Sequence, residues 1–125
     1  MSQKRNRPET IFCRRLKEAR QAAGFSQKNL GIAAGIDEFA ASARINRYEQ
    51  AVHEADAMTI ANLAKVLDVP LAYFYAEDDR LAQMILVFEK LPAKDQEKLL
   101  QQIEARGESR NASQKKPSHP SSPKD

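Results

Sequence analysis

The sequence predicts an all-α fold, and three observations support this prediction. Apolar residues recur at three- and four-residue spacing through most of the chain, which is typical of amphipathic helices. Glycine and proline fall between these periodic segments, where helices usually end or begin. No segment shows the two-residue alternation that is typical of a β-strand.

The composition limits the class of protein. At 125 residues the chain has room for one domain with a helical extension. Its 30% charged residues, and apolar runs well short of the roughly 18 residues that a membrane span needs, indicate a soluble protein. The single cysteine, Cys13, excludes an internal disulfide and favours a cytoplasmic location. We expect its thiol to be inert, although nearby basic residues could instead lower its pKa.

The first helix is expected over residues 9–23, after a basic, disordered arm formed by residues 1–8. Pro8 near its start and Gly24 directly after its end match the residue preferences of helix termini. Its apolar positions are Phe12, Leu16, Ala19 and Ala23.

Two short helices follow. Ser26 is a suitable N-cap for a helix over residues 27–34, which ends at Gly35, where a left-handed backbone is cheap only for glycine. The next helix is expected over residues 40–49, with Ile45 as the anchor that faces the core.

The rest of the chain contains four further helical segments and a tail. A fourth helix is expected over residues 58–67 and a short fifth one over residues 71–75. Two longer helices, 80–91 and 93–106, are hinged at Pro92. The last nineteen residues have no apolar periodicity and contain three prolines, so we expect a disordered tail. The predicted organisation is therefore an arm (1–8), a helical domain (9–79), a helical hairpin (80–106) and a tail (107–125).

Two helices joined by a tight turn need small residues where they approach each other, and the sequence has them at Gly31, Ala33 and Ala34. Apolar residues that would pack these two helices against the first helix are present at Leu30, Ile36 and Ile45. Together with their flanking motifs, these residues resemble the Cro and phage-repressor-like helix-turn-helix regulators, the XRE family. The resemblance runs from residue 16 to residue 74 and rests on RLKEAR (15–20), AGFSQKNL (23–30), AGI (34–36), INRYE (45–49) and TIANLAKVLDVPLAYFY (59–75).

The resemblance implies a five-helix DNA-binding domain that acts as a dimer on a pseudo-palindromic operator in double-stranded DNA. By position, Gln27 would contact backbone phosphate, Ser42, Ala43 and Arg47 would face base edges, and Arg44 would lie near bases or phosphate. The expected DNA-binding residues are Gln27, Lys28, Ser42, Ala43, Arg44, Asn46 and Arg47.

The chemistry of these residue types agrees with that role. A guanidinium can pair with guanine O6 and N7 through two hydrogen bonds, and short side chains let a helix approach the bases closely. The alternative is that Arg44 and Arg47 are ordinary solvated charges and that Ser42 is simply an exposed helix position.

Two segments depart from the family pattern. Residues 37–40 are an apparent four-residue insertion before the recognition helix, which corresponds to about one helical turn. It could lengthen that helix or bulge the turn, and we expect a turn capped by Asp37 with Phe39 packed inward. The loop after Glu49 lacks the usual basic residue and glycine, and His53 is its main group for a phosphate.

Charge is distributed unevenly. Residues 1–20 contain seven Lys and Arg against two acidic residues, whereas residues 21–106 contain nine against thirteen. We expect the N-terminal arm, with Lys4, Arg5 and Arg7, to add phosphate or minor-groove contacts.

No enzyme, cofactor or metal is expected. The sequence has no glycine-rich phosphate loop and no Ser/His/Asp or Cys/His arrangement, and His53 and His119 have no partners at ligand spacing. Tyr73, Phe74 and Tyr75 would close the core, the alternative being a platform on which bases stack. No small-molecule effector is indicated, because the C-terminal helices are too short to enclose a pocket.

The sequence therefore predicts a sequence-specific transcriptional regulator, a dimeric repressor that occludes a promoter. The alternative is a protein-interaction module, an antitoxin or coactivator-like bridge, that uses the same fold without reading DNA. For residues 80–106 two arrangements are open: a dimer interface, which we favour, or packing back on the domain.

Overall fold

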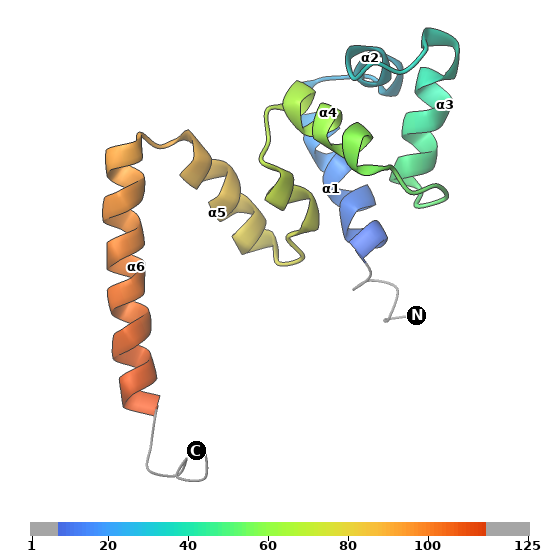
Figure 1. Cartoon of the computed structure of the whole chain (residues 1–125). Coiled ribbons are helices and arrows are strands. Elements are labelled where there is room, and N and C mark those ends of the chain that lie inside the picture. The colour runs from blue at the N-terminus through green and yellow to red at the C-terminus, as the bar shows by residue number, and fades with distance from the viewer. Residues whose placement is uncertain (1–7, 115–125) are drawn as a thin grey trace. The chain divides into compact units, whose positions relative to one another are not determined.

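The computed structural model describes the backbone of residues 8–114 and the side chains of residues 10–111, and it confirms the all-α class. Every regular element in this range is a helix (Figure 1). The elements are α1 (Pro8–Ala23), α2 (Gln27–Ala33), α3 (Glu38–Glu49), α4 (Ala57–Leu67), the 3-10 helix η2 (Leu71–Tyr75), α5 (Asp79–Lys90) and α6 (Ala93–Gln114). The arm predictions for Lys4, Arg5 and Arg7, the prediction for His119 and the tail from residue 115 lie outside the described residues.

The helix ends follow the predicted signals at Ser26, Gly24 and Gly35, and Asp56 is a further cap that was not predicted. Ser26 caps α2 by accepting the backbone N–H of Asn29 at 3.0 Å, and Asp56 caps α4 by accepting that of Thr59 at 2.8 Å. Gly24 and Gly35 end α1 and α2 with φ angles of +80° and +94°, in the region where a side chain would be strained. These ends fix where the chain leaves each helix and therefore how α1, α2 and α3 can pack.

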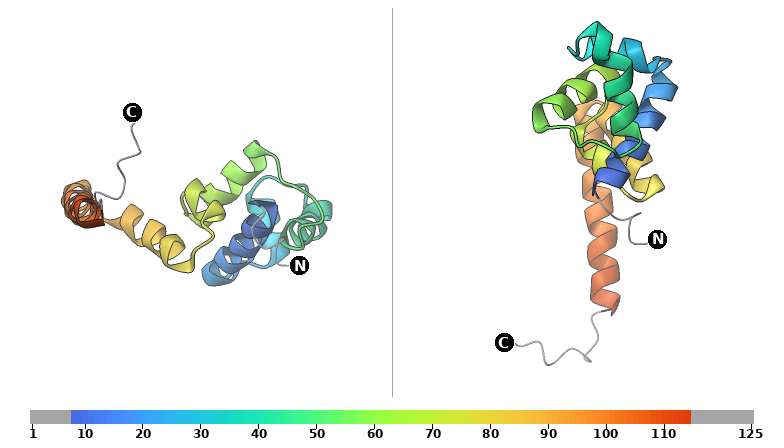
Figure 2. Two further views of the ribbon diagram at one scale, coloured as in Figure 1. Left: turned by 90° about the horizontal axis from the view of Figure 1, so that it is seen from below. Right: turned by 90° about the vertical axis from the view of Figure 1, so that its right-hand side faces the viewer.

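Contacts divide the chain into two units, residues 1–89 and 90–125. In the first unit, α1 contacts α3, α4 and η2, and α2 packs against α3 (Figures 1 and 2). Phe74 is completely buried and meets the Phe12 ring edge-on, with the ring centroids 5.1 Å apart. Tyr73 is also buried, so the prediction that residues 73 and 74 close the core is confirmed, while Tyr75 remains 47% exposed.

Helix α5 belongs to the first unit by its contacts, although the sequence placed a boundary after residue 79. One side of α5 packs on the core through Ala82, with Ile85 and Leu86 partly buried beside it. Its other side leaves Leu81, Met84 and Val87 about half exposed. Packing back on the domain thus accounts for one face of α5 and leaves an apolar second face uncovered.

Helix α6 continues to Gln114, eight residues beyond the predicted end at residue 106. The prediction that the disordered tail begins at Gly107 is wrong for residues 107–114. A glycine within a helix costs about 1 kcal/mol relative to alanine but does not end the helix. The first residue of this segment that cannot continue a helix is Pro117, which lies outside the described residues.

Candidate nucleic-acid interface

The crossing of α2 and α3 depends on the absence of a side chain at Gly31. A Cβ atom built there would lie 2.7 Å from the Cβ atom of Ala41 and 3.0 Å from the Ala41 Cα and carbonyl oxygen. Both residues are buried. The backbones of the two helices therefore approach as closely as sterics allow, which sets the angle at which α3 stands out from the domain.

Helix α3 has a buried side and an exposed side. Ala41, Ile45 and Tyr48 face the core, as predicted for Ile45. The opposite side presents Ser42, Ala43, Arg44, Asn46 and Arg47, all exposed, and Lys28 is exposed near the start of α2. Six of the seven predicted DNA-binding residues are thus exposed on α2 or α3.

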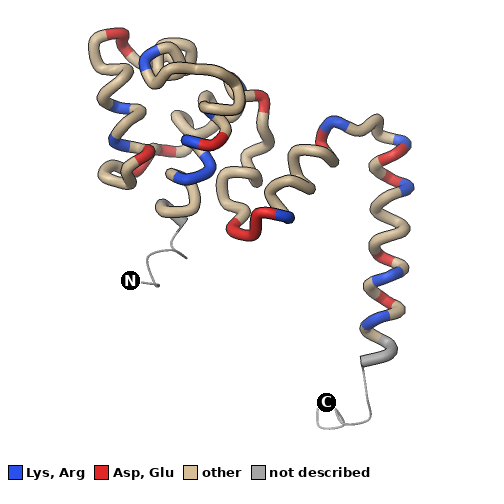
Figure 3. The backbone as a smooth tube through the Cα atoms, turned by 180° about the vertical axis from the view of Figure 1, so that it is seen from behind, with Lys and Arg blue, Asp and Glu red and all other residues tan. Residues whose placement is uncertain are grey.

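The two arginines on this side are available to a ligand. Neither guanidinium makes a hydrogen bond or ion pair with another residue that the structure describes. Arg44 and Arg47 line an open groove of about 720 Å³ between α3 and the loop to α4, together with His53 and Asp56. Figure 3 shows basic positions along α3 and acidic ones at its two ends.

Gln27, the seventh predicted residue, is half-buried and already bonded within the protein. Its side-chain amide nitrogen donates to the Oδ1 atom of Asn46 at 3.2 Å and to the Oε1 atom of Glu49 at 3.0 Å. The residue therefore joins the start of α2 to the far end of α3. Its amide oxygen accepts no hydrogen bond from a described residue, but an oxygen cannot donate to a phosphate.

A buried ion pair that the sequence did not predict holds α3 to α1. The Arg20 Nε atom donates to Glu49 Oε2 at 2.6 Å and its Nη2 atom to Oε1 at 3.2 Å. The side chains are only 13% and 1% exposed, respectively. Arg20 also donates to the carbonyl oxygen of Phe25 at 3.0 Å. The same guanidinium therefore connects α1, the turn before α2 and the last residue of α3.

A sequence signal for this pair was present. Arg20 lies four residues after the core residue Leu16, and Glu49 lies four residues after Ile45. Side chains four residues apart share one face of a helix, so Arg20 and Glu49 each lie on the buried face of their helix.

The insertion at residues 37–40 lengthens the recognition helix at its N-terminus. Asp37 caps α3, as predicted, by accepting the backbone N–H of Phe39 at 3.0 Å. The prediction that Phe39 packs inward is wrong, because its side chain is 92% exposed. Residues two apart on a helix point in roughly opposite directions, so Phe39 faces solvent once Ala41 faces Gly31. That contact leaves no room for an aromatic ring.

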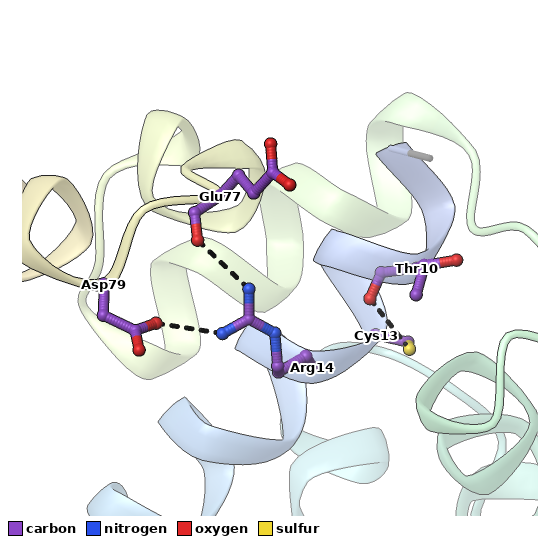
Figure 4. Close-up of a pocket in the computed structure, with 5 residues that line it drawn as sticks. All are labelled: Thr10, Cys13, Arg14, Glu77 and Asp79. Carbon is purple, nitrogen blue, oxygen red and sulfur yellow. Dashed lines mark hydrogen bonds and ion pairs between the residues drawn. The ribbon is translucent and has the colours of Figure 1, made fainter. Parts of the chain in front are cut away.

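Two further arginines of α1 donate hydrogen bonds to the segment that joins η2 to α5 and to the first residue of α5. Arg15, although charged, is only 2% exposed. Its Nε atom donates to the carbonyl oxygen of Ala76 at 2.8 Å, and its Nη2 atom donates to Asp79 at 3.0 Å and to the carbonyl oxygen of Glu77 at 3.1 Å. Arg14 donates to the same two groups, at 3.0 and 3.1 Å (Figure 4).

These bonds engage the arginines of α1 within the protein, whereas the expected phosphate contacts concern the arm, with Lys4, Arg5 and Arg7. Of the seven basic residues in the first twenty, Arg14, Arg15 and Arg20 are bonded within the protein. The arginines of α1 therefore stabilise the fold.

A wide cavity lies beside Arg14. It has a volume of about 480 Å³, is wide open, and is lined by Thr10, Cys13, Arg14, Glu77 and Asp79 (Figure 4). Burial raises the pKa of the Cys13 thiol despite the opposing effect of Arg14. A protonated thiol that donates to the Thr10 carbonyl at 3.1 Å agrees with the inert cysteine that we expect.

Acid is expected to weaken the contact between α1 and α5. The hydrogen bonds from Arg14 and Arg15 hold the pKa of the Asp79 carboxyl below its usual range. Because this pKa is lower in the folded than in the unfolded state, the carboxylate stabilises the fold above about pH 4, and this effect is lost as the pH falls through the folded-state value.

The variant Asp79→Asn should therefore flatten the dependence of the free energy of unfolding on pH between about pH 5 and pH 3. Urea denaturation at a series of pH values measures this slope. Glu38→Gln is the matched control, because Glu38 is exposed and no described residue pairs with it. Equal slopes for Asp79→Asn and the wild type would contradict the assigned role of Asp79.

No cluster of three potential metal ligands occurs within residues 10–111. Over the part of the chain that the structure describes, none of the helices is long and apolar enough to cross a membrane.

Comparison with known proteins adds one informative match. No protein-family model matches the sequence, and no curated protein matches it either. The crystal structure of the transcriptional regulator BswR, however, is similar with a TM-score of 0.70 and is 46% identical in sequence. The alignment covers 74% of this chain and 92% of BswR. We conclude that the chain belongs to the family of transcriptional regulators that includes BswR.

Proposed function

We propose that this protein is a sequence-specific DNA-binding regulator of the Cro and phage-repressor (XRE) type. It represses transcription and is located in the cytoplasm. A homodimer would place two α3 helices in successive major grooves about 34 Å apart and so block a promoter. The observation that carries the proposal is the exposed side of α3. There two arginines that make no hydrogen bond or ion pair with another described residue lie beside the short side chains of Ser42 and Ala43.

The expected roles on this side differ. Arg47 lies toward the far end of α3 and is proposed to read guanine O6 and N7. Arg44 lines the same groove as Asp56 and is proposed to contact bases or a neighbouring phosphate. Lys28 is proposed to contact phosphate, whereas Gln27 and Asn46 are proposed to act as a bonded pair that borders the contact surface.

The proposed dimer interface uses the apolar side chains that each helical segment leaves exposed. On α5 these are Leu81, Met84 and Val87, and on α6 they are Leu100 and Ile103. Their spacing of three residues keeps each set on one side of its helix.

Selection of bound duplexes from a random DNA pool at two salt concentrations tests the function. The proposal expects a two-fold symmetric motif with half-sites about one helical turn apart and an affinity that falls steeply with salt. Binding without any sequence preference, or no binding, would reject it.

The variant Arg47→Ala is expected to weaken binding to the selected site by about 1–3 kcal/mol and to relax specificity at one base pair. Fluorescence anisotropy with the selected duplex and its single-base variants measures both effects. Lys17→Ala is the control, because it removes an exposed positive charge from α1. Wild-type affinity and base preference in Arg47→Ala would show that another residue of α3 reads the base.

The alternative is a protein-interaction module that does not read DNA. The excess of acidic residues between positions 21 and 106, and the acidic pair at the start of α3, favour it. It predicts a stoichiometric protein partner and no salt-sensitive DNA affinity in the same selection.

A further inference from the structure

The first turn of the recognition helix carries the most exposed large apolar side chain of the described residues. Phe39 is 92% exposed, whereas Phe12, Phe74, Tyr48 and Tyr73 are all buried. An aromatic ring can bury about 150–250 Å² of surface, and Phe39 obtains almost none of that burial within this chain. Because Asp37 caps the helix at this point, the ring stands on a fixed backbone and not on a frayed end.

Helix geometry aligns Phe39 with the residues proposed to read DNA. Side chains four residues apart lie above one another, so Phe39, Ala43 and Arg47 form one row on the exposed side of α3. Eight residues at a rise of 1.5 Å separate the ends of this row by about 12 Å. The small side chain of Ala43 leaves the space between the ring and the guanidinium open.

The residues around the Phe39 ring suit a ligand that is mostly polar and charged and that presents one small apolar group. Ser42 and Asn46 lie beside the row. Arg44 and Arg47 give this side positive charge that complements a phosphate backbone, while the acidic residues Asp37 and Glu38 lie next to the ring at the start of the helix. On α3 Phe39 is the single exposed large apolar residue, so its exposed side does not offer the contiguous apolar patch of a protein interface. In the major groove, the apolar group that a base edge presents is the 5-methyl group of thymine.

We propose that Phe39 is a specificity-determining residue that contacts the 5-methyl group of a thymine in the major groove. This inference rests on the proposed function. It adds one apolar contact at the N-terminal end of the recognition helix, where helix-turn-helix proteins approach base edges. The four-residue insertion thus extends the reading surface by one turn, from Ser42 back to Phe39.

A double-mutant cycle, in which the Phe39 ring and the thymine methyl group are removed separately and together, tests the contact. In the selected duplex, each thymine is replaced in turn by uracil, which lacks only the 5-methyl group. Dissociation constants are measured for the wild type and for Phe39→Ala. One thymine in each half-site should weaken wild-type binding by roughly 3- to 5-fold when its methyl group is removed.

For Phe39→Ala the inference expects an affinity for the thymine duplex about ten-fold below that of the wild type. The same uracil substitution should then have no further effect on this variant. Leu71→Ala, which shortens a half-exposed leucine on η2, is the control and should keep both the affinity and the uracil effect of the wild type. Thermal unfolding should give similar melting temperatures for Phe39→Ala and the wild type, because the ring is almost fully exposed.

Three results would overturn the inference. Unchanged DNA binding by Phe39→Ala would do so, as would a uracil effect of equal size in both proteins; either would leave the proposed function intact. If the wild type selects no DNA motif at all, the proposed function fails, and the thymine contact fails with it.

Discussion

Replacing Arg20 with alanine is expected to lower the free energy of unfolding of the first unit by about 3–5 kcal/mol. The variant leaves the Glu49 carboxylate, which is 1% exposed, without its charged partner. Gln27 still donates one hydrogen bond to it, but an amide does not compensate a buried negative charge. Urea denaturation followed by far-ultraviolet circular dichroism measures the loss.

Two controls separate the buried charge from the loss of an arginine as such. Arg14→Ala breaks an ion pair whose side chains are 41% and 79% exposed, and it should cost no more than about 1 kcal/mol. The double variant Arg20→Met, Glu49→Leu removes both charges and should recover most of the lost stability. If Arg20→Ala is no more destabilising than Arg14→Ala, the Glu49 carboxylate is solvated and does not hold α3 to α1.

The second large effect is expected at Gly31. In an ordinary helix, alanine is more favourable than glycine by about 1 kcal/mol. Gly31→Ala should instead destabilise the first unit by about 3 kcal/mol, because the new methyl group meets the Cβ atom of Ala41 at 2.7 Å and its backbone at 3.0 Å. These atoms cannot move aside as the end of a long side chain can, so α2 and α3 must separate.

A glycine in another helix provides the matched control. Gly107 lies in α6, and a Cβ atom built there meets nothing within 4 Å, so Gly107→Ala should stabilise the helix by about 0.5–1 kcal/mol. Adding Ala41→Gly to Gly31→Ala should recover part of the loss, because the contacts with the backbone at position 41 remain. Thermal denaturation of the wild type, the two single variants and the double variant gives the order of their stabilities. Stabilisation by Gly31→Ala would show that the helices are not in close contact.

The sequence predicted the helices well because their apolar periodicity and end signals agree. Ser26, Gly35 and Asp37 each act locally, through a hydrogen bond or a backbone angle, and such effects depend on few neighbours. The helix starts therefore lie within two residues of the prediction. The end of α6 was missed because a polar composition resembles disorder, although no residue before Pro117 prevents a helix.

The candidate interface was less predictable, since it depends on which side each helix turns toward its neighbour. Phe39 was expected inside because a capped turn would keep the acidic pair Asp37 and Glu38 away from phosphates. The contact between Gly31 and Ala41 instead determines the rotation of α3 and turns the ring outward. Arg20 and Glu49 were not recognised as partners, because they are 29 positions apart and charged helix residues are usually solvated. The positions of the two residues, each one turn after a core residue, indicate that each is buried, but which two charges pair becomes visible only when the helices are packed.

The burial of Arg15 also determines how much of the chain can fold by itself. Its guanidinium donates to Glu18 on α1 and to three groups that lie beyond η2, at Ala76, Glu77 and Asp79. A fragment that stopped after η2 would leave this buried charge with Glu18 as its remaining acceptor among the described residues. An autonomous fragment of this regulator therefore extends at least to Asp79, the first residue of α5, so the folding unit is longer than the family motif, residues 16–74, that it contains.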